Sequence, residues 1–430
     1  MCAALFASLG RGGALVLCAW LGACGDGSEA SAPAAWPYSA GRGPRRDPGL
    51  SEVRALLEKR RGDLALPLLE RVPGFEAECL RARAQFQQGD SVAALASLER
   101  ARALDGKQPE LWASEAEILA GLARVRGASE VLAEGFTHCG PDAALFRAQG
   151  VVELYTEGHG AQALEALERA RARDPELPFL VWPLARAHVL VGRALLERAP
   201  AEATAHALAA FALDPEFLDA RELEAEGLAG ELRFEEALAV YDALAAAGRS
   251  YGETPALLEQ RCATRCLLER DRAGAVEHYL AARRRGLDDE GLGFGRTVLE
   301  EEQRSALTRG LAAAEAENWP AAEHEFARAL ELVPGDLAAE NHLAVALFQR
   351  EEFRGAAEAW ERVLARSLAS QTSLPDPVPL NLAKAWRLAG EAGRARAVLA
   401  QLLDREPDGS ASEAARELLF VLEAEAQAER

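Results

Sequence analysis

From residue 50 onward, apolar and polar positions follow a pattern that recurs about every 34 residues. The clearest copies are QRSALTRGLAAAEAENWPAAEHEFARALELVPGD (303–336) and LAAENHLAVALFQREEFRGAAEAWERVLARSLAS (337–370). In each copy, positions 4, 7, 8 and 11 share one face of a helix, because neighbours on a helix recur at i, i+3, i+4 and i+7. Positions 20, 24 and 27 share one face of a second helix. The pattern therefore predicts an all-α chain of helix pairs.

The residue types at equivalent positions support this prediction. When the two copies are aligned, Gly310 falls on Ala344 and Phe326 on Trp360. A small residue at position 8 lets two helix backbones approach closely, and a large residue at position 24 fills the space between neighbouring pairs. Proline at position 32 ends the second helix because it lacks an N–H and clashes with the preceding turn. The pattern recurs at 75–108, 109–142, 143–177, 178–217, 218–251, 256–289 and 376–409, and a degenerate copy occupies 50–74.

These positions resemble the tetratricopeptide repeat, a family of helix–turn–helix units of this length. The resemblance implies a right-handed superhelical solenoid of antiparallel helix pairs. In that family, positions 2, 5, 9, 12 and 13 of each first helix line a concave groove that binds an extended peptide or a helix. We call the surface formed by these positions the first-helix face.

The first-helix face of this chain contains several side chains suited to binding a protein. Arginine and asparagine can bind a peptide backbone or a carboxylate, and aromatic rings supply buried area. The acidic residues Glu117, Glu222 and Glu226 occupy the same face in other copies. The candidate contact residues are Arg83, Phe86, Arg147, Tyr155, Trp182, Arg186, Gln260, Asn341, Gln349, Lys384 and Arg387.

Changes in composition and in repeat register predict the domain organisation. Residues 1–23 are expected to be a lipoprotein-type signal peptide, and the Gly- and Pro-rich residues 24–49 a flexible linker. An N-terminal repeat array is expected at 50–290 and a C-terminal array at 303–409, with residues 291–302 as a linker because they interrupt the register. Residues 410–430 are expected to form a capping helix, which a solenoid needs where its stack ends.

The N-terminal tetrad Leu21-Gly22-Ala23-Cys24 resembles the lipobox of bacterial lipoproteins. It ends an apolar run that is too short to span a bilayer. The resemblance implies that Cys24 is acylated and that the protein is lipid-anchored in the bacterial envelope. Because Gly25 follows the cysteine, it favours the periplasmic face of the outer membrane. The alternatives are an ordinary signal peptide, an uncleaved tether with an incidental cysteine, or a cytoplasmic protein.

Charge and motifs limit the chemistry that the chain can perform. Its formal net charge of −20 argues against binding nucleic acid, because neutralising phosphates requires lysine and arginine. Cys262, Cys266 and His278 could supply metal ligands, but the cysteines occupy core positions, where a free thiol packs as a small hydrophobe. The sequence His324-Glu325 begins like a zinc-protease motif, but Arg328 stands where the second histidine is needed. We therefore expect no metal, no cofactor and no catalytic residue.

The expected function is that of a non-catalytic scaffold, tethered to a membrane, which binds a peptide or helix of a protein partner. One alternative is an accessory subunit of a carbohydrate- or peptidoglycan-processing complex. Another is an enzyme whose site lies in a helix groove, because a catalytic set assembled only in space leaves no motif in the sequence.

Overall fold

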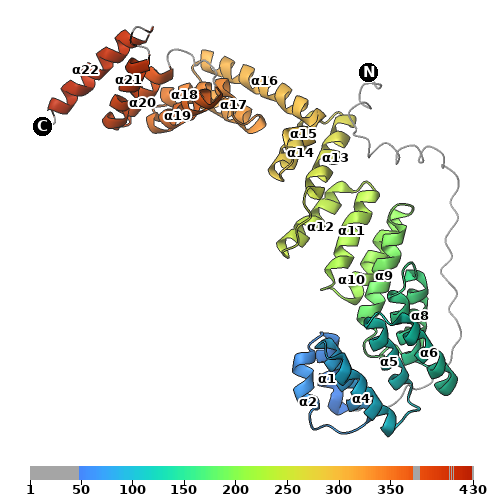
Figure 1. The fold of residues 1–430 in the computed structure, drawn as a ribbon. Helices are drawn as coiled ribbons and strands as arrows, with labels where there is room; N and C mark the ends of the chain where they lie inside the picture. Colours follow the sequence, from blue (N-terminus) through green and yellow to red (C-terminus); the bar gives the residue numbers. More distant parts are fainter. Residues whose placement is uncertain (1–47, 371–377, 406, 408, 410, 429–430) are drawn as a thin grey trace. The chain divides into compact units, whose positions relative to one another are not determined.

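The computed structural model describes residues 48–428 except 371–377, 406, 408 and 410. Over these residues the chain is all-α: it contains α-helices and one short 3₁₀-helix, and no strand (Figure 1). The all-α prediction is therefore confirmed. Within the described part of the chain, no helix combines the length and the apolar character that a membrane span requires. The predicted signal peptide and most of the predicted linker, including Cys24, lie outside the described residues.

The chain divides into two compact units between Leu258 and Glu259, which is inside α13. The first unit contains η1 (Pro48–Leu50), α1 (Ser51–Glu58), α2 (Gly62–Leu69), α3 (Phe75–Gln87), α4 (Ser91–Leu104), α5 (Pro109–Gly121), α6 (Val125–Cys139), α7 (Ala143–Leu154), α8 (Gly160–Arg173), α9 (Val181–Leu195), α10 (Pro200–Leu213), α11 (Leu218–Gly230), α12 (Phe234–Ala246) and the start of α13 (Thr254–Leu268). The second contains the rest of α13, α14 (Arg272–Arg284), α15 (Asp289–Leu292), α16 (Phe294–Glu315), α17 (Trp319–Leu332), α18 (Leu337–Gln349), α19 (Phe353–Ser370), α20 (Val378–Leu388), α21 (Ala392–Arg405) and α22 (Ser412–Ala428). We call them the N-terminal unit and the C-terminal unit.

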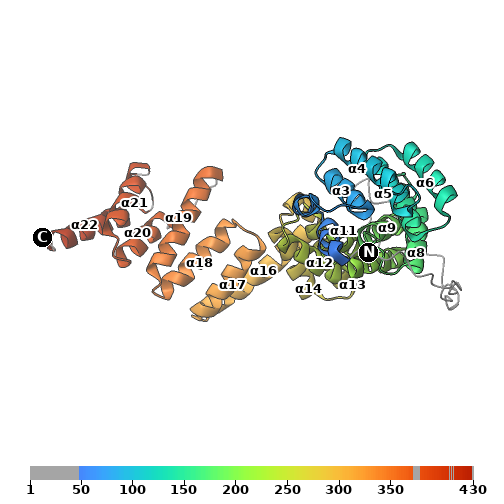
Figure 2. The same ribbon diagram turned by 90° about the horizontal axis from the view of Figure 1, so that it is seen from below.

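Consecutive helices pack against each other as pairs, and Figure 2 shows α3, α4, α5 and α6 side by side. The helices begin and end where the repeat pattern places them. For example, α17 ends at Leu332, two residues before Pro334, and Asp336 then caps α18 by accepting a hydrogen bond from the Ala339 N–H at 2.8 Å. Such a side chain satisfies one of the unpaired N–H groups at a helix start.

The turn between the two helices of a pair contains a residue with left-handed backbone geometry in nearly every pair. In α3–α4 and α20–α21 this residue is glycine, whereas in α16–α17 it is Glu317, with φ of 57°. Only the α9–α10 turn lacks such a residue among the described pairs. The complete set is Arg60, Gly89, Ala123, Gly158, Leu232, Arg270, Glu317, Glu351 and Gly390.

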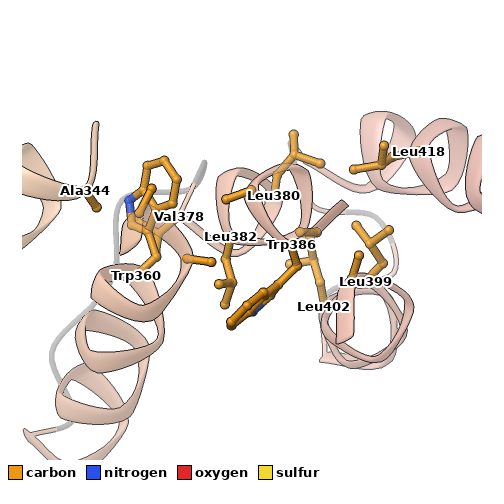
Figure 3. Packing of buried hydrophobic residues seen from close by; sticks show 14 of the residues in the cluster. Ala344, Trp360, Val378, Leu380, Leu382, Trp386, Leu399, Leu402 and Leu418 are labelled. Atoms are coloured by element: carbon orange, nitrogen blue, oxygen red, sulfur yellow. The ribbon is translucent and has the colours of Figure 1, made fainter. Parts of the chain in front are cut away.

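Small residues produce the close helix approaches that the pattern predicts. Ala322 is fully buried, and a Cβ atom at Gly310 would lie 2.6 Å from Cε1 of Phe326. That separation is too short for a van der Waals contact, so only glycine fits there without a shift. At the end of the C-terminal unit, Trp360 and Trp386 fill the core between α18 and α22 (Figure 3). The predicted capping segment is helical in α22, which buries Leu418 and Leu422.

The segment 291–302, which the sequence predicts to link the two arrays, is helical apart from Gly293. Asp288 caps α15 by accepting a hydrogen bond from Gly291 N–H at 2.7 Å, and only Gly293 separates α15 from α16. Gly295 lies inside α16, where a Cβ atom would be 2.3 Å from Cδ1 of Tyr279. This glycine therefore serves a close contact between helices.

Candidate functional site: the first-helix face

Two predicted contact residues of the N-terminal unit belong to a buried cluster of charges. Arg147 of α7 is fully buried and donates from Nε to Glu117 at 2.7 Å and from Nη2 to Glu110 at 2.9 Å. Arg83 of α3 forms an ion pair with the second carboxylate oxygen of Glu117. Both carboxylates come from α5, so the cluster joins the first helices of three consecutive pairs.

The cluster keeps its charges inside the protein because each one is paired. Burial raises the pKa of Glu117, but Arg147 and Arg83 outweigh burial, and the net shift is downward. Burial lowers the pKa of Arg147, but Glu110 and Glu117 raise it by more than burial lowers it. The net shift is upward, so the guanidinium stays charged. Arg83 and Arg147 are therefore bound within the chain, and neither presents an unpaired guanidinium to a partner.

The connection between α8 and α9, residues 174–180, lies over this cluster. Pro178 accepts a hydrogen bond on its carbonyl oxygen from Arg147 Nη1 at 3.0 Å. The ring of Phe179 lies 4.1 Å from Cζ of Arg83, measured to the ring centroid, and the Phe179 N–H donates to Glu58 of α1 at 3.1 Å. Phe179 also packs against the apolar core of α1, α2 and α3. The charged cluster on the first-helix face of this unit is thus covered by a segment of its own chain.

The next predicted residues form an arginine–aromatic group beside this connection. Two guanidinium groups lie near Trp182, with Cζ of Arg60 at 4.4 Å and Cζ of Arg186 at 5.2 Å from its ring centroid. Arg186 also lies 5.5 Å from the centroid of Tyr155. The structure therefore brings Tyr155, Trp182 and Arg186 together, as their shared face predicted, but places them in contact with one another.

Other predicted contacts have structural partners as well. Phe86 packs over Gly121, where a Cβ atom would lie 2.4 Å from Cζ of the ring. In the C-terminal unit, Gln260 donates to the carbonyl of Gly291 at 2.9 Å, and Asn341 accepts from Trp360 Nε1 at 2.8 Å. Arg387 forms a two-pronged ion pair with Glu425, which fastens the capping helix α22 to α20.

Two candidates in the C-terminal unit keep their polar groups available. Gln349 at the end of α18 and Lys384 in the middle of α20 are exposed and have no side-chain partner among the described residues. On the same repeat positions, Leu311 and Leu388 expose 42% and 50% of their surface. This part of the first-helix face combines exposed apolar carbon, an amide and a positive charge.

The described cysteines are protonated thiols, and His278 contacts a carboxylate. Burial raises the pKa of Cys262 to about 11, and it also raises the pKa values of Cys79, Cys139 and Cys266, so these thiols stay protonated near neutral pH. Nδ1 of His278 lies 2.8 Å from Glu259, which Arg285 also contacts at 3.1 Å. A protonated thiol is a weak nucleophile and a weak metal ligand.

A histidine pair links α9 and α10. Nδ1 of His188 and Nδ1 of His206 lie 2.9 Å apart, so one neutral ring donates a hydrogen bond to the other. Burial and the neighbouring His206 lower the pKa of His188 to about 4, and burial lowers the pKa of His206. Both rings are therefore neutral at physiological pH.

Comparisons with known proteins show similarity to solved helical-repeat structures. No family model matches this chain, and no curated protein matches it. A structure from a study of Pseudomonas aeruginosa pilF matches over 51% of this chain and 96% of its own, with 19% identity and a TM-score of 0.36. The TPR2AB domain of yeast Sti1, in complex with pHSP90, matches over 56% and 98%, with 16% identity and a TM-score of 0.27. A tetratricopeptide repeat protein from Parabacteroides merdae matches over 58% and 96%, with 12% identity and a TM-score of 0.30.

Sequence reasoning missed three residues of this surface: Glu58, Glu110 and Phe179. Phe179 and Glu110 occupy position 2 of their copies, so the repeat register alone could have identified them. Glu58 occupies position 9 of the degenerate copy 50–74, so the register could have identified it as well, but its contact with Phe179 joins residues 121 positions apart and left no local signal.

Proposed function

We propose that this protein is a non-catalytic scaffold that binds a segment of a protein partner on the first-helix face of its C-terminal unit. The observation that carries this proposal is that Gln349 and Lys384 are exposed and have no side-chain partner among the described residues, while Leu311 and Leu388, at the same repeat positions, are exposed as well. Apolar side chains supply binding energy through buried area, and an amide and an ammonium group select the orientation and charge of a partner. The partner segment should therefore contain apolar residues and a carboxylate.

Crosslinking in cells tests this surface. A photoreactive amino acid at position 349 should capture one protein reproducibly in the native envelope, identified by mass spectrometry. Lys384→Glu should reduce this capture at least tenfold, because it reverses the only charge proposed to meet the partner's carboxylate. Lys59→Glu makes the same charge change at an exposed position after α1 and serves as the matched control. Equal capture by the Lys384→Glu variant and the control would exclude this surface.

We further propose that a lipid on Cys24 tethers the scaffold to the periplasmic face of the bacterial outer membrane, with residues 24–49 as the flexible spacer. The support is the tetrad Leu21-Gly22-Ala23-Cys24 and the Gly- and Pro-rich stretch that follows it. Cys24→Ser should lose incorporation of a labelled fatty acid and should leave the membrane fraction. If the variant protein still partitions with membranes, the lipid anchor is wrong.

A further inference from the structure

The α8–α9 connection is bound by the N-terminal unit in the way that a protein binds a foreign peptide. Its contacts come from three separate first helices: Glu58 of α1, Arg83 of α3 and Arg147 of α7. Two of the three contacts are made to main-chain groups, the carbonyl of Pro178 and the N–H of Phe179. Any extended chain offers such groups, so these two contacts do not depend on sequence.

The third contact selects a side chain. The Cζ atom of Arg83 lies 4.1 Å from the centroid of the Phe179 ring, and the Cζ atom of Arg147 lies 5.9 Å from the same centroid. A cation over an aromatic face is attracted by the negative charge of the ring's π-electrons. The surface therefore favours an aromatic residue at this point of an extended segment.

The internal segment occupies this surface at a conformational disadvantage. Phe179 has φ of 63°, in the left-handed region, which is unfavourable for a residue with a bulky side chain. The Phe179 N–H reaches Glu58 at an exposed position, where water competes for the carboxylate. A peptide from another molecule could make the same contacts with ordinary extended geometry.

We propose that the surface formed by Glu58, Arg83 and Arg147 is a second binding site, for an extended peptide with an aromatic residue that follows proline. The residues Pro178 and Phe179 occupy this site in the free protein, and a partner peptide binds by displacing them. This proposal goes beyond the function proposed above, because it concerns the N-terminal unit and involves neither Gln349 nor Lys384.

Peptide binding to full-length protein tests the displacement. The probe is a fluorescent peptide, ELPFL, with the sequence of residues 176–180, and the control peptide is ELPAL. The Phe179→Ala variant should bind ELPFL at least tenfold more tightly than the wild type does, because its own ring no longer competes. Phe179→Leu should give a smaller gain, since it removes the aromatic ring of the internal segment but keeps an apolar side chain. Neither variant should bind ELPAL measurably.

Matched controls separate this site from an unspecific effect. Phe294→Ala removes an exposed ring from the C-terminal unit and should bind ELPFL no more tightly than the wild type does. Adding Arg83→Gln to Phe179→Ala should abolish the gain. Folding is checked by circular dichroism. A folded Phe179→Ala variant without a gain, or with an equal gain for ELPAL, would overturn the proposal. If Phe179→Ala does not fold, the absence of any gain in Phe179→Leu would overturn it.

Discussion

Arg147 is a single buried charge that connects several elements of the N-terminal unit. It is fully buried and contacts two carboxylates and one main-chain carbonyl, so it joins α5, α7 and the α8–α9 connection. Removing one partner of a buried ion pair leaves the other charge desolvated without compensation. Arg147→Met should therefore lower the free energy of unfolding by about 3–5 kcal/mol, measured by urea denaturation.

The control for this prediction is an ion pair of the same chemistry at the surface. Arg126 and Glu130 form an i,i+4 pair in which both side chains are largely exposed. Arg126→Met should change the free energy of unfolding by less than about 1 kcal/mol, because such pairs are well solvated. Similar losses in the two variants would show that Arg147 is not the centre of a buried network.

The histidine pair makes stability depend on pH. The unfolded chain takes up protons near pH 6.5, whereas His188 in the folded protein does so only near pH 4. The unfolded state thus binds more protons in this window, so stability falls as the pH drops from about 6.5 towards 4. Of the groups around the pair, Arg171 also lowers the pKa of His188 and Glu202 raises that of His206.

Thermal melts at several pH values measure this effect. The double variant His188→Leu, His206→Leu should lose less stability than the wild type between pH 6.5 and 5, because it has no buried imidazole to protonate. Carboxylates affect both proteins equally, so the difference between the two curves isolates the pair. Parallel curves would contradict neutral burial of these histidines.

At the scale of the helix pair, close packing depends on positions 8 and 20. Ala322 is fully buried at position 20 of its copy. Ala322→Phe should overpack the crossing of α16 and α17 and cost about 1–3 kcal/mol, seen as a lower melting temperature. His324→Phe introduces the same ring on the exposed side of α17 and should leave the melting temperature nearly unchanged.

The sequence predicted the helices well because their information is local. The apolar period, the small residues and the proline at position 32 all act within one or two helices, and the observed bounds follow them. The helices at residues 291–302 could not be predicted from the glycines there, because glycine has two uses that look alike in sequence, a turn with positive φ and a close contact between helices. Gly293 has the first use and Gly295, against Tyr279, has the second.

The candidate site was only partly predictable. The register placed Arg83, Arg147 and Trp182 on one face, and the structure does bring them into neighbouring groups. The repeat register could not reveal that Phe179 would cover the charged cluster and donate a hydrogen bond to Glu58. That contact depends on how far several stacked pairs curve, which is a sum of small rotations that no single repeat encodes.

At the scale of the whole molecule, each helix pair is stabilised mainly by its neighbours, so damage should stay local. Trp386 is fully buried in the core around α20. In Trp386→Ala, amide hydrogen exchange should accelerate in α19 to α22 and stay unchanged in α3 to α6. Trp112→Ala, in the core of α3 to α7, should give the opposite pattern. Acceleration over the whole chain in either variant would indicate a single cooperative unit.

The left-handed turn residues have a consequence for how this chain could be strengthened. Glycine occupies that position in some pairs, but Leu232, Glu317 and Glu351 hold it at a cost of about 1–2 kcal/mol each. Because the turns are separate and do not share contacts, relieving them should have additive effects. Replacing these residues by glycine one at a time should raise the stability of the array in steps, because each replacement removes the strain of one turn. The binding surfaces lie on the helices and should not change.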